Sequence, residues 1–462
     1  MNDFEVDVLI LGGGLTGLTI GYELSKAGLT FKIVEKSSRF GGVIQTIKEN
    51  GFMYETGPNT GIIGSPELGV LLDELKNDVS LQIGDEAVKR RLILKKGKWK
   101  AMPSGLGSAV TTPLYSLKDK FRILAEPFKR PGTNPDETLD KLVLRRMGKS
   151  FLDYAIDPFI LGVYAGDPSL LVTKYAFPKL YNLEQNYGSF IGGTIKKRKE
   201  VKSDAEKLAT RDVFSLKNGL EELVDVLAEK MGKSNILTDV DNLKVTKDGE
   251  TFLTEASQKN DPIKLRSKRV ISALNSTNLD AEMLPFIPPS FFDAIGKVNY
   301  APTVEIVLGF NNWTGIELKA FGGLIPHREG REILGVLFLS AFLPNRAPEG
   351  GALLTIFMGG VRNSKWIDAT EAEITSTIEK EMKELMELES FKPDLFKIIR
   401  HHKAIPQYSF ESEAKNREIE LLEKEHPGFL LGGNAVDGIG IADRVKQGVQ
   451  LAAKVKNQLD NE

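Results

Sequence analysis

Three glycines near the start of the chain have the spacing of a phosphate-binding turn. Gly12, Gly14 and Gly17 follow an apolar run and open a segment whose apolar residues repeat with helical spacing. In this pattern the first glycine makes a tight turn, the second lets the backbone approach a pyrophosphate, and the third lets helix and strand pack closely. Because the helix start also offers unpaired N–H groups to phosphates, the pattern indicates a dinucleotide site.

An acidic residue stands where a ribose would need one. Glu35 ends a second apolar run, Phe31–Val34, about 20 residues after the glycine turn, where a carboxylate accepts hydrogen bonds from a ribose. A glycine turn alone could be purely structural. The complete order of strand, turn, helix, strand and acid favours nucleotide binding, but it does not distinguish NAD from FAD.

Two further motifs favour FAD. Arg39 and the pair Gly41-Gly42 follow directly after the acid and resemble an extension of flavin enzymes, in which the glycines let the chain pass close to the cofactor and the arginine can reach its phosphates. Residues 432–441 (GGNAVDGIGI) stand at the start of the last helix. We expect backbone N–H groups there to face the isoalloxazine ring, where the positive helix end stabilises the anionic reduced flavin. A capped terminal helix with a glycine turn is the plainer alternative for this motif.

The composition limits the remaining chemistry. The 462 residues include no cysteine, which excludes disulfides, thiolate metal sites, a thiol nucleophile and a cofactor attached through sulfur. The four histidines are too scattered to suggest a metal site, and a net charge of −2 without a basic stripe argues against nucleic acid as a partner. With no signal peptide and no apolar stretch of ~18 residues, we expect a cytoplasmic protein, soluble or peripheral on the cytoplasmic membrane.

The length predicts two or three packed domains, and the order of elements predicts an α/β fold. We expect a discontinuous Rossmann-type FAD-binding domain of residues 1–85, 205–290 and 400–462. A sheet-based substrate domain (residues 86–112 and 291–399) and a helical domain (residues 113–204) would be inserted into it. The more local expectations are strands at 6–11 and 31–34, helices over 15–27, 136–154 and about 441–459, and an antiparallel sheet within 300–362.

Motifs in the middle and later parts of the chain narrow the class. They are, in order, DPFILGVYAGD at 157–167, AFP at 176–178, LE at 183–184, GS at 188–189, FSL at 214–216, NGL at 218–220, PNRAP at 344–348 and AIPQY at 404–408. Together with the two ends of the chain they resemble the protoporphyrinogen/coproporphyrinogen oxidase family, whose FAD domain is of the amine-oxidase and glutathione-reductase type. The resemblance covers nearly the whole chain in order.

This resemblance implies an enzyme of heme biosynthesis with non-covalent FAD. Such an enzyme removes six hydrogens from a porphyrinogen in three flavin cycles, and oxygen accepts the electrons as hydrogen peroxide. Matching motif to motif, the cofactor contacts fall on Gly12, Gly13, Gly14, Leu15, Thr16, Gly17, Glu35, Lys36, Arg39, Gly42, Val43, Gly57, Pro58, Asn59, Thr60, Val240, Asn434, Ile439, Gly440 and Ile441. Val240 would meet the adenine through its backbone. The family has tryptophan or arginine where this chain has Val43, so no side-chain contact is implied there.

The same resemblance places a propionate-binding arginine at Arg91 and an apolar clamp at Leu324, Leu337 and Phe357. A tetrapyrrole is a broad apolar disc, which needs apolar walls and cationic anchors for its carboxylates. From the residues alone, Arg91 could equally belong to a solvated basic run at 89–91, and the three apolar residues to an ordinary strand core.

Two porphyrinogens compete as the substrate. Protoporphyrinogen IX carries two propionates and coproporphyrinogen III carries four, so the second would favour a more basic pocket mouth. Lys89, Arg90, Lys95 and Lys96 make it possible, and we favour protoporphyrinogen IX. An amine or carotenoid oxidoreductase on the same fold, and a flavin-binding protein without turnover, are the other hypotheses.

No residue stands out as a general base, so we expect positioning to supply most of the catalysis. The segment 113–200 is as consistent with a solvated helical domain as with one that rests on a membrane surface. The sequence leaves a homodimer open.

Overall fold

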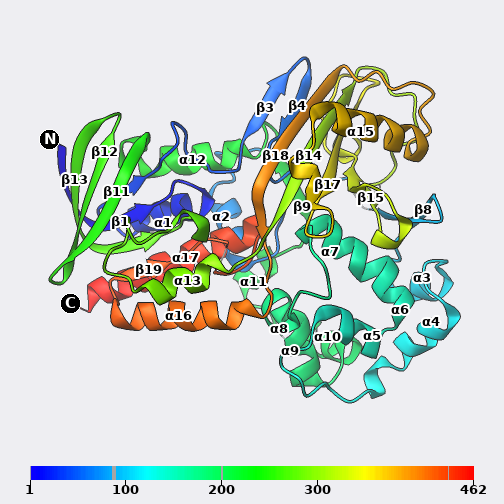
Figure 1. Ribbon diagram of the computed structural model, residues 1–462, viewed down its shortest axis with the longest axis horizontal. Helices are drawn as coiled ribbons and strands as arrows, with labels where there is room; N and C mark the ends of the chain where they lie inside the picture. The colour runs from blue at the N-terminus through cyan, green and yellow to red at the C-terminus, as the bar shows by residue number, and fades with distance from the viewer. Residues whose placement is uncertain (1, 86–89, 199–200, 435, 462) are drawn as a thin grey trace.

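A computed structural model describes residues 2–85, 90–198, 201–434 and 436–461 (Figure 1). The chain has the predicted α/β fold, with two large sheets joined by long strands and a group of helices below the second sheet. No helix within these described ranges is long and apolar enough to cross a bilayer.

The first sheet is built around β1 (Asn2–Leu11), whose residues from Val8 to Leu11 are fully buried. Such a continuous apolar run suits a parallel strand covered on both faces. Its parallel neighbours are β2 (Phe31–Val34) and β13 (Asp261–Ser272). The sheet is completed by β10 (Ile236–Leu237), which pairs with β2, by β19 (Phe429–Leu431), which pairs with β13, and by the antiparallel β12 (Thr251–Gln258) and β11 (Val240–Asp248).

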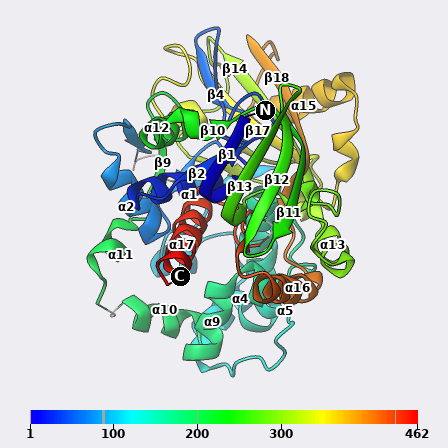
Figure 2. The same cartoon turned by 90° about the vertical axis from the view of Figure 1, so that its left-hand side faces the viewer.

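Helices from both ends of the chain cover this sheet. On one face α1 (Leu15–Lys26) packs beside α17 (Ile441–Asp460) and α12 (Glu221–Met231), as Figure 2 shows for α1 and α17. The other face carries α13 (Pro289–Gly296) and α16 (Glu411–Glu425). The first and last elements of the sequence therefore share one core.

The second sheet has the order β18-β14-β17-β16-β15-β7-β8. Its strands are β18 (Leu395–Pro406), β14 (Tyr300–Phe310), β17 (Ala352–Gly359), β16 (Ile333–Leu337), β15 (Gly322–Leu324), β7 (Arg91–Lys95) and β8 (Lys98–Ala101). The predicted antiparallel pairing within 300–362 is confirmed, and only the link from β15 to β7 is parallel. Helix α15 (Glu371–Leu385) packs Ile374, Ile378 and Met382 onto one face of this sheet.

The helices of residues 106–198 gather below the second sheet (Figure 1). They are α3 (Leu106–Thr111), α4 (Leu117–Leu124), α5 (Leu139–Arg146), α6 (Lys149–Phe151), α7 (Asp157–Tyr164), α8 (Thr173–Ala176), α9 (Pro178–Tyr187) and α10 (Phe190–Arg198). Their buried centre is Arg146, whose guanidinium donates to Glu126 at 2.7 Å and to Glu184 at 2.6 Å.

The single helix predicted over 136–154 is wrong, because the chain is interrupted at Gly148. Gly148 has a φ of 98°, and a Cβ there would lie 2.0 Å from Oδ1 of Asp119. That carboxylate accepts hydrogen bonds from the backbone N–H and the hydroxyl of Ser150. A tertiary contact, which periodicity does not show, therefore breaks the helix.

Smaller elements join the two sheets. They are the hairpin β3 (Thr46–Glu49) and β4 (Phe52–Glu55), the small sheet β5 (Gly61–Ile62), β9 (Val213–Leu216) and β6 (Leu81–Ile83), and helices α2 (Pro66–Glu74), α11 (Asp204–Leu208) and α14 (Leu339–Phe342). The other predicted boundaries differ from the observed ones mainly at the ends, since β1 begins at Asn2 and α17 ends at Asp460.

Candidate active site

The predicted phosphate turn lies between β1 and α1, with backbone contacts that require glycine. Gly12 has a φ of 103°, and a Cβ on Gly17 would lie 2.0 Å from the carbonyl oxygen of Gly12. The N-cap of α1 is Gly14, so no side chain caps the N–H groups of the first turn. Thr16 in that turn has a buried hydroxyl without a partner among the described atoms. This end of α1 offers its donors to a ligand rather than to the protein.

Glu35 lies directly beside the glycine turn. Its Oε2 accepts a hydrogen bond from the N–H of Gly13 at 2.8 Å, and its Oε1 accepts one from the N–H of Ser37 at 2.9 Å. Both carboxylate oxygens are thus held in place and still have lone pairs for ribose hydroxyls. This geometry is the one expected of the predicted ribose acid.

The Arg39-Gly41-Gly42 loop packs onto the glycine turn, since the N–H of Gly41 donates to the carbonyl of Gly13 at 2.7 Å. The role expected for Arg39 is different in the structure. Its guanidinium donates to the carbonyls of Gly42 and Ile44 and pairs with Glu221 at 3.1 Å. Arg39 is therefore occupied in holding the loop closed.

A second turn, residues 57–60, rests on the same loop. A Cβ on Gly57 would lie 2.1 Å from the carbonyl oxygen of Val43, so only glycine permits this contact. Val43 itself is 68% exposed. Asn59 is buried and points its side chain toward the second sheet, while Pro58 and Thr60 are half-buried. The turn therefore connects the cofactor side to the sheet face described below.

Val240 and Lys36 flank the ribose end. The N–H of Val240 donates to the carbonyl of Glu35 at 3.0 Å, which leaves its carbonyl as the backbone group for an adenine. Lys36 is largely exposed and lies 3.8 Å from Asp241, so its side chain points to solvent.

The C-terminal motif forms a loop over the start of α17. The carboxylate of Asp443 accepts hydrogen bonds from the N–H groups of Ile439 and Gly440, so these two donors are already capped, contrary to expectation. The donors that remain in the first turn are the N–H groups of Ile441 and Ala442, because the N–H of Asp443 donates to the carbonyl of Gly440. The carbonyl of Asn434 accepts from the hydroxyl of Tyr408 at 2.6 Å, while Oδ1 of Asn434 is buried without a partner among the described atoms.

These features fit a flavin dinucleotide. Two buried oxygens without partners, those of Thr16 and Asn434, belong to the predicted contact set, and no side chain caps the start of α1. Buried polar atoms normally have partners. A bound dinucleotide would supply them.

One face of the second sheet carries the predicted apolar clamp. In β15, β16 and β17 nearly every residue is buried, and the half-buried exceptions are Leu324, Leu337 and Phe357. Strand pairing puts them on one face, because Leu324 and Phe357 flank Gly335, and Leu337 faces Thr355. The opposite face is the one that α15 covers.

The predicted propionate anchor stands at the edge of this face. Gly322 of β15 has Arg91 of β7 as its strand neighbour on one side and Leu337 of β16 on the other. Arg91 and the clamp residue Leu337 are therefore separated by one glycine. The side chain is exposed, although partial burial lowers its pKa. No hydrogen bond or ion pair of the Arg91 guanidinium is found within the described part of the chain. A carboxylate of a ligand could therefore reach it.

The other cations of this region differ in availability. Lys95 donates to the carbonyls of Pro113 and Leu114 and lies over the ring of Tyr154, so it holds the helices to the sheet. Arg90 and Lys96 are exposed. Lys89 lies outside the described residues.

Sequence reasoning missed several residues that support the site. Tyr408 braces the loop of Asn434, and Gln447 of α17 accepts from the N–H of Gly433 at 2.7 Å. Arg444 donates to Gln447 and to the carbonyl of Gly438, and burial lowers its pKa. Their roles depend on tertiary contacts, and only the position of Tyr408 in the AIPQY motif was a signal.

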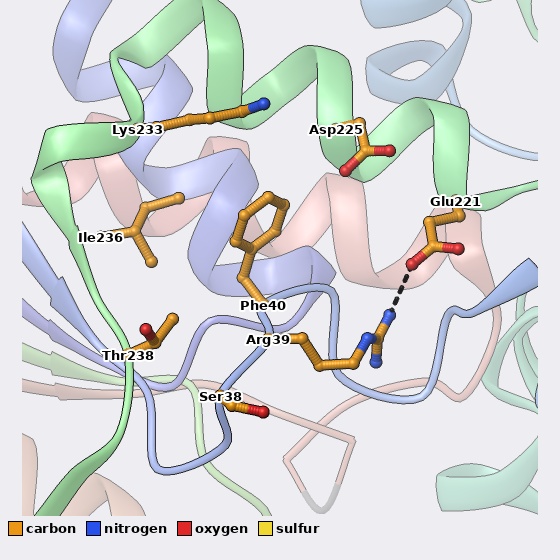
Figure 3. A pocket seen from close by; sticks show the side chains of 8 residues that line it. All are labelled: Ser38, Arg39, Phe40, Glu221, Asp225, Lys233, Ile236 and Thr238. Carbon is orange, nitrogen blue, oxygen red and sulfur yellow. Dashed lines mark hydrogen bonds and ion pairs between the residues drawn. The ribbon is translucent and has the colours of Figure 1, made fainter. Parts of the chain in front are cut away.

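A cavity of about 430 Å³ adjoins the outer side of the Arg39 loop (Figure 3). It is lined by Ser38, Arg39, Phe40, Glu221, Asp225, Lys233, Ile236 and Thr238. Of these residues only Arg39 belongs to the predicted cofactor contacts, and its guanidinium pairs with Glu221, another lining residue. It is therefore not the flavin pocket.

Comparison with known proteins gives the family. Residues 15–456 match the model of the flavin containing amine oxidoreductases. Protoporphyrinogen oxidase 1, chloroplastic, from Arabidopsis thaliana is 31% identical over 98% of this chain and 88% of its own length. Coproporphyrinogen III oxidase from Bacillus subtilis (strain 168) is 26% identical over 97% of both chains.

Solved structures show the same fold at low identity. A protein from Exiguobacterium sp. 255-15 superposes with a TM-score of 0.79 at 20% identity, covering 98% of this chain and 99% of that one. Cyclohexylamine oxidase from Brevibacterium oxydans IH-35A gives a TM-score of 0.69 at 14% identity, covering 98% and 99%.

The fold, the glycine turn between β1 and α1 and the family match identify the protein as a flavin-dependent oxidoreductase. The chain belongs to the flavin-containing amine oxidoreductase family. The predicted resemblance to the protoporphyrinogen/coproporphyrinogen oxidases is confirmed by the relatives.

Proposed function

We propose that this enzyme is a porphyrinogen oxidase of heme biosynthesis with non-covalent FAD. It oxidises protoporphyrinogen IX to protoporphyrin IX and reduces O2 to H2O2. The observation that carries the proposal is the half-buried apolar face of Leu324, Leu337 and Phe357, with Arg91 at its edge. The relatives are named for this oxidation.

The chain's own residues do three things in this reaction. The glycine turn at Gly12–Gly17, the carboxylate of Glu35 and the start of α17 would hold FAD, whose ring supplies the acceptor for one hydride in each of three cycles. The apolar face holds the porphyrinogen disc, and Arg91 pairs with a propionate. The turn at Gly57–Thr60 separates the two, because Asn59 reaches from the cofactor loops to the sheet face. Orientation supplies most of the rate enhancement.

We assign cofactor binding and substrate binding to separate domains. Residues 1–85, 205–290 and 400–462 form the cofactor domain, residues 86–112 and 291–399 the substrate domain, and residues 113–204 the helical domain. The proposed location of the protein is the cytoplasm.

Coproporphyrinogen III is the second candidate substrate. Arg90 and Lys96 are exposed near Arg91 and would suit additional propionates, and the Bacillus subtilis relative is named for this substrate. The test is a side-by-side measurement of porphyrin fluorescence and peroxide release with each porphyrinogen and the purified yellow protein. The porphyrinogen with the higher kcat/KM is the substrate. A FAD-loaded protein that oxidises neither would overturn the proposal and leave an amine or carotenoid oxidoreductase, or a flavin protein without turnover.

We also propose that α4 touches a membrane surface. Four apolar side chains with helical spacing are strongly exposed along α4 and the turn after it: Leu117, Phe121, Leu124 and Phe128. Exposed cations flank them at Lys118 and Arg130. An apolar stripe beside cations suits an anionic bilayer surface.

Flotation of the holoprotein with anionic and neutral vesicles tests the membrane contact. We expect binding to anionic vesicles at low salt that is lost when Phe121 and Phe128 are both changed to Ser. If wild type and double variant both remain unbound and the wild type sediments as a homodimer, the stripe is a dimer contact instead.

A further inference from the structure

The face that carries the clamp also contains a buried carboxyl group. Glu305 lies in the middle of β14 and is 1% exposed. Its cross-strand neighbours are Phe357 on β17 and Ile399 on β18. Because paired residues of neighbouring strands share a face, the carboxyl group lies on the clamp side of the sheet.

The contacts of this carboxyl group reach both the cofactor loops and the outer strand. Its Oε1 accepts a hydrogen bond from the Asn59 amide nitrogen at 2.8 Å, and Asn59 Oδ1 accepts one from the Thr355 hydroxyl at 3.0 Å. Its Oε2 lies 3.5 Å from Nε2 of His401 on β18. The Asn59 side chain is thus held from two strands of the second sheet.

The side chains that face Glu305 come from β14, β17 and β18. On β14 its same-face neighbours are Thr303 and Val307, and on β17 it faces Phe357. On β18 the titratable group that faces it is His401, whose side chain is 24% exposed. Lys397, further along β18, is paired with Glu49. Burial raises the pKa of Glu305, and the contacts with His401 and Asn59 oppose that rise.

We propose that Glu305 is a positioning residue of the active site: it is held beside His401 of β18, and through Asn59 it fixes the turn between cofactor and substrate. The inference rests on the proposed function. An uncharged side chain would hold Asn59 at a lower desolvation cost, so a buried carboxyl beside a histidine has a use beyond packing.

The sign of the pH effect follows from the geometry. The ionised carboxyl accepts from both Asn59 and His401. When it takes up a proton at low pH, the carboxyl group loses its negative charge, and the two contacts that favour the ionised form weaken. Activity therefore falls as the pH drops through the pKa of Glu305, which burial raises above that of an ordinary carboxyl group.

The variants Glu305→Gln and His401→Gln test this, with Glu381→Gln as the matched control. Glu381 is also a buried glutamate of the substrate domain, but it lies on α15 across the sheet, where it accepts from the N–H of Glu332. We expect kcat of Glu305→Gln to fall roughly tenfold to a hundredfold with a smaller change in KM, because a misplaced turn costs orientation. Glu381→Gln should leave kcat and its pH profile unchanged.

The pH dependence of kcat in the two variants tests the role of Glu305. Glu305→Gln should lose the acid limb of kcat, and His401→Gln should move it to higher pH, since the partner that favours ionisation is gone. In the holoprotein the visible absorption of bound FAD should titrate with the same limb in wild type and not in Glu305→Gln.

The outcomes distinguish failure of this inference from failure of the proposed function. An acid limb that survives in Glu305→Gln, or a flavin titration unchanged by it, overturns the inference. A flavin titration that behaves as expected in a protein that oxidises neither porphyrinogen supports the role of Glu305 and overturns the proposed function alone.

Discussion

At the scale of single residues, the partners of a side chain decide what it can do. Arg39 and Arg91 are both arginines in predicted ligand contacts. Arg39 has its guanidinium occupied by two carbonyls and Glu221, whereas Arg91 is exposed at the edge of an apolar face. The first maintains a loop, and the second is available to a carboxylate.

Arg91→Ala should raise KM for the porphyrinogen about tenfold to a hundredfold, since a charge-assisted hydrogen bond contributes about 1.5–3 kcal/mol. FAD should remain bound, as seen in the visible spectrum. Arg90→Ala, a neighbouring exposed arginine, is the control and should change KM less. An unchanged KM for Arg91→Ala would remove its role.

At the scale of elements, the glycine turn makes the start of α1 a binding site. Gly17 is needed by the protein itself, because a Cβ there would meet the carbonyl of Gly12 at 2.0 Å. Gly14 is different, since a Cβ there would meet no atom within 4 Å and its φ of −75° suits any residue. The empty space beside Gly14 is where a pyrophosphate would pass.

Gly14→Ala should therefore weaken FAD binding roughly tenfold or more, a loss of about 1.4 kcal/mol, while the melting temperature of the apoprotein stays close to wild type. Gly17→Ala should lower both FAD affinity and apoprotein stability. Titration with FAD and thermal unfolding of the apoprotein measure the two effects. Equal FAD affinity of Gly14→Ala and wild type would contradict the assignment.

At the scale of the whole molecule, buried ion pairs tie the parts together. Arg346, in the loop before β17, pairs with Glu55 of β4 at 3.1 Å, and both side chains are 1% exposed. The carboxylate also accepts from the N–H of Leu220 and the hydroxyl of Thr46. The substrate sheet and the cofactor loops are thus joined around one carboxylate.

Arg346→Ala should destabilise the protein by about 3–5 kcal/mol, because removing one partner leaves a buried charge uncompensated. Denaturant unfolding of the apoprotein measures this. Arg266→Ala, which breaks a solvent-exposed pair with Asp248, is the control and should cost under about 1 kcal/mol. A similar cost for both variants would argue against the proposed tie.

Arg362, which follows β17, links the second sheet to α7 and the turn after it, because its guanidinium pairs with Asp157 and Asp167. Burial would raise the pKa of Asp167, but hydrogen bonds from Arg362 and Ser169 outweigh it and lower the pKa to about 2. A depressed carboxyl pKa stabilises the fold above the unfolded value, near 4, and this contribution is lost as the pH falls toward 2.

Asp167→Asn should therefore cost about 2 kcal/mol at pH 7, and the difference from wild type should shrink below pH 4. Unfolding by denaturant at pH 7, 5 and 3.5 measures it. A difference that does not depend on pH would show that Asp167 acts through packing.

The sequence by itself determined the α/β class, the cofactor turn and the family, because these depend on local order: a glycine spacing, the acid after it and motifs in register. Residues 31–34 were predicted as a strand with the bounds observed. Tertiary structure alone decided what depends on contacts between distant segments. It broke the helix predicted over 136–154 at Gly148 and occupied Arg39 within its own loop. It also brought Arg91 and Leu337 to either side of Gly322 and buried Glu305 against Asn59, because neither strand pairing nor a desolvated carboxyl can be read from spacing along the chain.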